Sequence, residues 1–74
     1  MKVSDVKDIV DRQPFRRFAV RLSNGAQYAF NEQRDLGVSK DYQMLFYFGP
    51  GGGAVRIDTE NIVEVFETNG TNGA

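Results

Sequence analysis

Two alternating segments joined by Asn24-Gly25 constrain this chain more than any other feature. Both have apolar residues at every second position, the period of a half-buried strand: Phe18, Val20 and Leu22, then Ala26, Tyr28 and Phe30. Asn-Gly between such segments is a strong signal for a β-hairpin. The sequence therefore predicts an antiparallel strand pair.

The length of the hairpin loop follows from the faces of the two strands. A two-residue loop would set Leu22 opposite Gln27, so that an apolar face would meet a polar one. A three-residue loop, residues 23–25, sets Leu22 opposite Ala26 and keeps the apolar side chains together, with Gly25 in the left-handed conformation. We predict this loop, and with it the pairs Val20–Tyr28 and Phe18–Phe30.

A helix is expected before the hairpin and further strands after it. Residues 4–13, SDVKDIVDRQ, have apolar residues at helical spacing, with Ser4 or Asp5 as the cap and Pro14 as the stop. NEQRD is a polar bend or bulge after which LGVS resumes a strand, and the further strand-like segments are QMLFYF, AVRID and NIVEVFE. We interpret this order as one helix followed by five short strands.

One helix and five short strands in 74 residues predict a mainly β fold. The expected architecture is an N-terminal helix followed by a five-stranded antiparallel small barrel, SH3-like or Sm-like, because closure removes sheet edges. Residues 1–67 form the single domain. Residues 68–74 have no apolar side chain larger than alanine and are expected to be a disordered tail.

The segment from Met44 to Phe48 is apolar on both faces. Met44, Phe46 and Phe48 share one face, and Leu45 and Tyr47 share the other. Such a strand is usually buried on both sides. Either face is compatible with the core, and the other would lie under the helix or against a neighbouring subunit.

The glycine-rich stretch from Gly49 to Gly53 follows this strand. A phosphate-binding loop needs its glycines between a strand and a helix, with a Lys-Ser/Thr pair. Here a second strand follows, and Pro50 lacks a backbone donor. We interpret the stretch as an exposed hairpin loop whose glycines supply positive φ angles.

The amino-acid composition argues against catalysis and metal binding by this chain. It has no histidine and no cysteine, so the commonest general base, metal ligand and nucleophilic thiol are missing. Asp58 and Glu60 share a turn, but a divalent cation needs more converging oxygens. We predict no catalytic, metal or cofactor site and no small-molecule substrate.

Charge and size favour self-association. Residues 1–40 contain eight Lys/Arg and five Asp/Glu, whereas residues 41–74 contain one Arg and five Asp/Glu. A basic and an acidic half of this kind are compatible with a contact between subunits or with a partner surface. A small core without disulfides usually needs another source of stability, and oligomerisation remains. We predict a non-catalytic module that self-associates and binds protein. Its expected interface residues are Leu45, Tyr47, Val55, Ile57, Val63 and Val65.

The order of helix, QPFRRF, strand, LSNG and VSKDYQMLFYF resembles a family of short uncharacterised bacterial proteins. That family has a helix ending in Pro-Phe-Arg-x-Phe, a Leu-x-Asp/Asn-Gly hairpin and a Ser-x-Asp turn. The likeness rests on Pro14, Phe15, Arg16, Phe18, Leu22, Asn24 and Gly25. The resemblance carries no activity to transfer.

The layout also resembles the Sm-like superfamily, which includes the bacterial Hfq proteins. LSNG is similar to the first Sm hairpin, and VRID to the second Sm motif, with Ile57 in place of the usual glycine. This resemblance implies a ring-forming homo-oligomer and, as the alternative function, RNA binding through basic and aromatic residues. The candidates are the basic residues Arg16, Arg17, Lys40 and Arg56, the aromatic Tyr42, and Asp58 of the VRID segment.

The expected cellular location of the protein rests on two features of the sequence. Charges interrupt the first ten residues, which is unlike a secretion signal. The longest apolar run, Met44 to Phe48, is too short to span a membrane. We expect a cytoplasmic protein without a membrane partner.

Overall fold

The computed structural model describes residues 1–67, and the expected tail lies outside the described residues. A helix, six strands and two short 3-10 helices follow one another: α1 (Val3–Val10), β1 (Phe18–Leu22), β2 (Gln27–Phe30), η1 (Gln33–Asp35), β3 (Leu36–Val38), β4 (Met44–Phe48), β5 (Ala54–Asp58), η2 (Thr59–Asn61) and β6 (Ile62–Glu67). The expectation of a mainly β fold with an N-terminal helix is confirmed.

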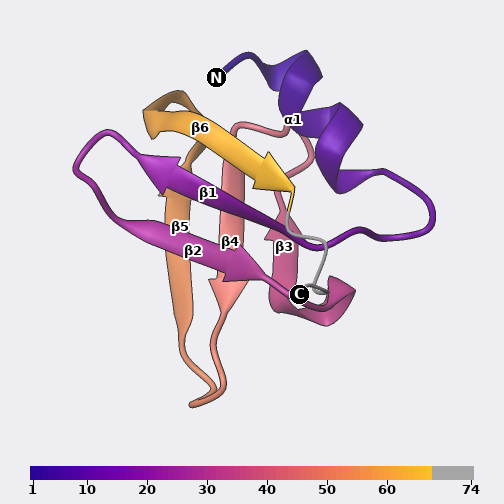
Figure 1. Cartoon of the computed structure of the whole chain (residues 1–74), viewed down its shortest axis with the longest axis vertical. Helices are drawn as coiled ribbons and strands as arrows, with labels where there is room; N and C mark the ends of the chain where they lie inside the picture. The colour runs from indigo at the N-terminus through magenta and orange to yellow at the C-terminus, as the bar shows by residue number, and fades with distance from the viewer. Residues whose placement is uncertain (68–74) are drawn as a thin grey trace.

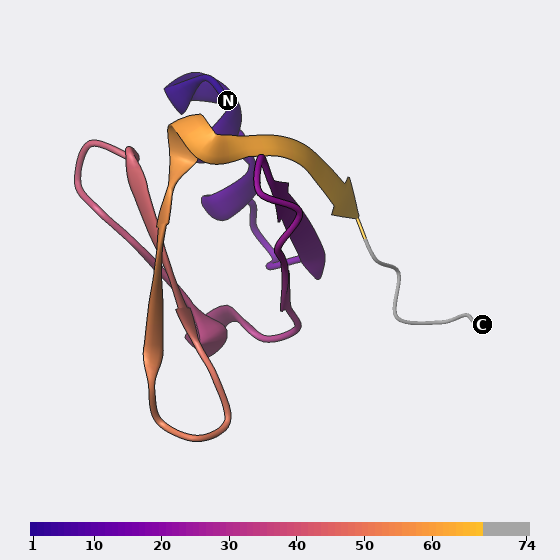
Figure 2. The same cartoon turned by 90° about the vertical axis from the view of Figure 1, so that its left-hand side faces the viewer.

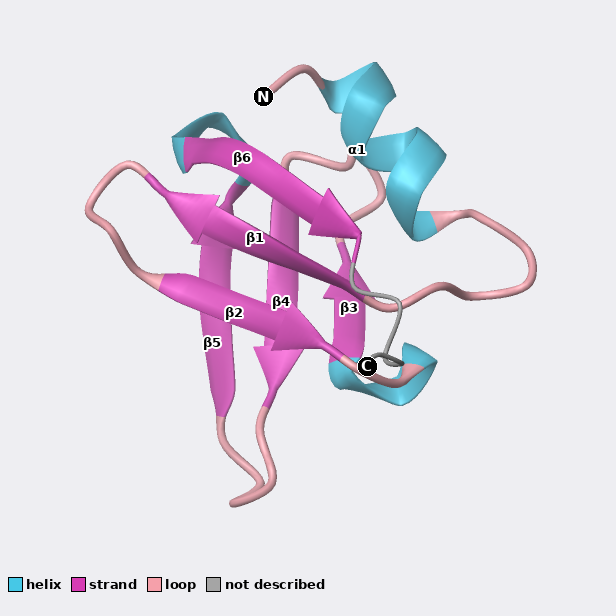
Figure 3. Ribbon diagram, viewed as in Figure 1, coloured by secondary structure: helices cyan, strands magenta, loops and turns pink. Residues whose placement is uncertain are grey.

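The strands form two antiparallel sheets. The first has the order β2-β1-β6 and the second has the order β3-β4-β5. The strands of the first sheet cross those of the second (Figure 1; Figure 3), and the chain passes between the sheets at η1 and η2. Within residues 1–67 no strand pairing joins the sheets, so the closed five-stranded barrel is not observed. Side chains join them instead, as at Tyr28 and Tyr47, whose ring centroids lie 5.5 Å apart.

The sixth strand arises at the polar segment NEQRD. Residues 33–35 form η1, and side chains of Glu32 and Asp35 cap each other's backbone. The Glu32 amide donates to Asp35 Oδ2 at 3.1 Å. This turn ends β2 and starts β3 as a separate strand in the other sheet, which is why five strands were expected and six are found.

The β1–β2 hairpin has the predicted three-residue loop. Val20 pairs with Tyr28 and Phe18 with Phe30, and the Leu22 amide donates to the Ala26 carbonyl at 2.8 Å. Gly25 has a φ of +90°, in the left-handed region that favours glycine. The predicted register is confirmed.

Helix α1 begins earlier than expected and without a side-chain cap. Its N-cap is Lys2, so the prediction of Ser4 or Asp5 as the cap is wrong. The α-amino group of Met1 donates to the carbonyls of Thr59 and Ile62, at 3.2 Å and 3.4 Å. These long-range contacts tie the start of the helix to the β5–β6 turn.

The core lies between the sheets, and α1 covers it at one end (Figure 2). Its buried members come from both sheets and the helix: Val6, Val10, Phe18, Val20, Phe30, Leu45, Ile57 and Ile62. Phe18 and Phe30 stack with centroids 4.9 Å apart, and Tyr47 meets Phe30 edge-on at 5.7 Å. The core face of β4 is therefore that of Leu45 and Tyr47.

The glycine-rich stretch closes the β4–β5 hairpin, as predicted. The Gly49 amide donates to the Gly53 carbonyl at 3.1 Å, and Phe48 pairs with Ala54. Gly52, with a φ of +86°, is the glycine in this loop that needs the left-handed region.

Candidate interaction surface

The second sheet presents an apolar stripe away from the core. Alternation along β4 directs Met44, Phe46 and Phe48 outward, because Leu45 is buried in the core. On β5, Asp58 pairs with Met44 and Arg56 pairs with Phe46. We call this surface, made by residues 37, 44, 46, 48, 54, 56 and 58, the outer face.

The outer face is uncovered in the part of the chain that the structure describes. Figure 2 shows the second sheet with its far side free of any helix or strand, and 43% of Phe48 is exposed. A Cβ atom on Gly37 would lie 2.9 Å from Phe48 Cε2, so the Phe48 ring lies across this glycine. Because Gly37 has no side chain, the Phe48 ring can pack against β3 at this position.

Two opposite charges lie beside the apolar stripe. Arg56 is exposed and Asp58 is half-buried. None of the four ion pairs within residues 1–67 includes either of them. The outer face therefore combines apolar contact area with one cation and one anion outside those pairs.

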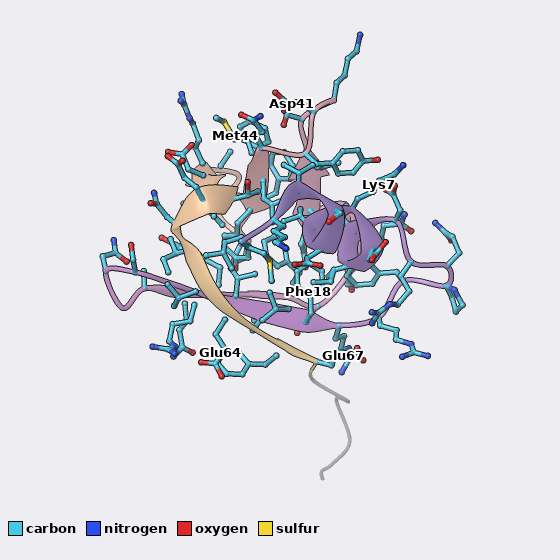
Figure 4. All side chains as sticks on the ribbon, turned by 90° about the horizontal axis from the view of Figure 1, so that it is seen from above. Lys7, Phe18, Asp41, Met44, Glu64 and Glu67 are labelled. Carbon is cyan, nitrogen blue, oxygen red and sulfur yellow. The ribbon has the colours of Figure 1, made fainter. Side chains whose placement is uncertain are left out.

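An open pocket of about 370 Å³ lies at the Met44 end of the outer face. Met1, Val3 and Met44 give it apolar walls, and Asp58 and Glu60 are acidic lining residues. Met44 and Asp58 belong to the pocket and the outer face alike, so the two features form one continuous surface. Figure 4 shows Met44 away from Phe18 and the first sheet.

The residues that the sequence suggested for an interface are divided by the fold. Leu45 and Ile57 are 2% and 1% exposed and belong to the core. Tyr47 and Val65 are partly buried against that core. Val55 and Val63 remain accessible, with 36% and 56% exposed. A surface built on β4 therefore uses the face opposite to Leu45 and Tyr47.

The suggested RNA-binding residues come from three places. Arg16 and Arg17 are exposed in the α1–β1 connection, and Arg16 Nη1 lies 3.4 Å from Glu67 Oε1. Lys40 and Tyr42 lie in the β3–β4 turn, whereas Arg56 and Asp58 lie on β5. The Tyr42 hydroxyl donates to Asp11 Oδ2 at 2.7 Å, which turns it toward the end of α1.

Ion pairs and hydrogen bonds shift three pKa values. Glu67 accepts from Arg12 at 2.7 Å, and this contact, with a smaller contribution from Arg16, lowers the pKa of the Glu67 carboxyl. The Ser39 hydroxyl and the Gln43 amide lower the pKa of Asp41. Stability from both carboxylates is present above their ordinary pKa and is lost as pH falls through the lowered values.

The contact between Tyr42 and Asp11 raises the pKa of Tyr42 above its ordinary value of 10.0, chiefly through the hydrogen bond. The raised value means that its stabilisation is complete below pH 10.0 and is lost as pH rises through the raised pKa. We expect Asp11→Ala to lower the Tyr42 pKa toward 10.0, as measured by NMR titration of the tyrosine ring carbons. Asp8→Ala, which removes another carboxylate of α1, should leave it unchanged. An unchanged titration in Asp11→Ala would contradict the contact.

Within residues 1–67, no group of three or more Asp or Glu side chains is arranged to hold a metal ion. No helix in this part of the chain has the length and apolar character needed to cross a membrane. Comparison with family models, curated proteins and solved structures found no match for this chain. The pocket and the outer face are therefore the features on which a function can be argued.

Proposed function

We propose that this chain is a non-catalytic binding module that self-associates through the outer face of the second sheet. In this proposal the order of the helix and strands is that of a small SH3-like or Sm-like domain. The turns at η1 and η2 carry the chain between two sheets that do not close into a barrel. The observation that carries the proposal is the apolar stripe of the outer face, in which Phe48 is exposed and Met44 and Phe46 are half-buried.

Apolar side chains exposed to water favour association, because association removes them from water. Monomeric proteins rarely leave contiguous large apolar side chains exposed, and those that do often use them for association. Burying such side chains gains about 25 cal/mol per Å² of apolar surface. A small domain without disulfides gains most from this contribution, since its own core gives a thin margin of stability.

Sedimentation velocity over micromolar to millimolar concentrations tests the proposal. We expect the wild-type chain to form a larger species as concentration rises, and Phe48→Ser to remain a monomer. Val63→Ser removes another exposed apolar side chain, on β6, and should behave as the wild type. A wild-type chain that stays monomeric throughout would refute self-association. Loss of association in Val63→Ser alone would move the interface to β6.

RNA binding has less support from the side-chain contacts. Arg16 already has Glu67 as a partner, and Tyr42 has Asp11. Titration of labelled uridine-rich and adenine-rich oligonucleotides at low salt tests it, because phosphate contacts strengthen as salt falls. We expect no binding. Salt-dependent binding that Arg17→Glu abolishes would favour RNA over the proposed function.

A further inference from the structure

The outer face has the features of a surface that is complementary to itself. It carries an apolar stripe, one cation and one anion, and at its end an open pocket. We propose that its partner is a second copy of the same face, packed across a two-fold axis so that Arg56 of each copy faces Asp58 of the other. This inference rests on the proposed function and specifies its geometry.

The register of the second sheet fixes where the axis lies. Arg56 stands level with Phe46, and Asp58 stands level with Met44. A two-fold axis parallel to the sheet and perpendicular to its strands places β4 on β4 and β5 on β5, running in opposite directions. With the axis midway between these two levels, Arg56 faces the second copy's Asp58, and Met44 faces its Phe46. Packed sheets lie about 10 Å apart, a gap that an arginine and an aspartate can bridge.

The same arrangement gives Phe48 a place to insert. In this register, Phe48 of one copy lies beyond Met44 of the other, at the end of the outer face where the pocket opens. That pocket has apolar walls at Met1, Val3 and Met44 and a volume of about 370 Å³. The most exposed aromatic side chain of the face and the pocket beside it are therefore brought together twice by symmetry.

The charges of Arg56 and Asp58 favour a second copy of the chain over other partners. A partner of uniform charge would attract Arg56 or Asp58 and repel the other, whereas a second copy satisfies both at once. The last seven residues of this sequence, TNGTNGA, have no large apolar side chain with which to cover the stripe. A second copy supplies both the apolar surface and the opposite charges.

Exchange of the two charges tests the geometry by sedimentation equilibrium. Arg56→Asp places two carboxylates together at each symmetric contact, and Asp58→Arg places two guanidinium groups together. Each should weaken association by about tenfold or more. The double variant Arg56→Asp with Asp58→Arg restores opposite charges and should return association to near the wild-type level. Thermal unfolding of each variant at low concentration checks that it is folded.

Matched controls use the other sheet. Arg21→Asp and Glu64→Arg change the net charge by the same amounts on β1 and β6, and should leave association unchanged. If the wild type associates but the single exchanges have no effect, or the double variant does not recover, the two-fold geometry is overturned while the proposed function stands. A wild-type chain that is always monomeric overturns both.

Discussion

Replacing Phe30 with alanine is expected to remove a large part of the protein's free energy of unfolding. Phe30 is completely buried, stacks on Phe18 and meets the edge of Tyr47, so it joins both sheets. Removal of a buried phenylalanine costs about 3–5 kcal/mol. A domain of this size is stable by about 4–11 kcal/mol, from 0.05–0.15 kcal/mol per residue. The loss therefore takes up a large part of the margin.

Urea unfolding, followed by far-ultraviolet circular dichroism, measures this loss. Phe48→Ala removes the same side chain from the outer face, where 43% of it is exposed, and should cost much less. Both variants are compared at concentrations below self-association, so that only the folding of one copy is measured. Equal losses in the two variants would contradict the assignment of core and outer faces.

The features that could be predicted from sequence are local ones. The register of β1 against β2 depended on three loop residues and on the alternation of side chains on each side of them. Gly25 could be placed because the three-residue loop requires a left-handed residue there. The glycine-rich loop was interpreted correctly for a similar reason, since a strand stands on each side of it.

The features that could not be predicted depend on contacts between distant residues. The start of α1 is held by the Met1 amine, which bonds carbonyls in the β5–β6 turn at sequence separations of 58 and 61. No local capping pattern carries that information. The choice of core face on β4 is similar, because both faces are apolar and only packing against β1, β2 and α1 selects Leu45.

The apolar stripe of the candidate site could be predicted from the sequence, whereas the pocket and the charges beside the stripe could not. The two-faced pattern of residues 44–48 already indicated that one apolar face would need a second cover, and the structure identifies it as the outer face. The pocket was not visible, because it forms where Met1 and Val3 meet Asp58 and Glu60. The pairing of Arg56 with Phe46 likewise required the β4–β5 register.

A carboxylate introduced at Val6 is expected to be as damaging as the loss of Phe30. Val6 is 2% exposed and lies in the core cluster, so α1 contributes directly to the core. Val6→Asp loses the burial of the valine, about 1.5–3 kcal/mol, and adds the larger cost of an unpaired charge out of water. The folded state should be destabilised by more than about 3 kcal/mol, because both penalties act together.

Val3→Asp provides the matched control in the same helix. Val3 is 39% exposed in the first turn of α1, where a negative charge interacts favourably with the helix dipole. Its stability should be close to that of the wild type at low concentration. Burial raises the pKa of the carboxyl introduced at Val6, so Val6→Asp should regain stability as pH falls, relative to Val3→Asp. If Val6→Asp unfolds at the wild-type urea concentration, α1 is not part of the core, and the sheets alone hold the fold.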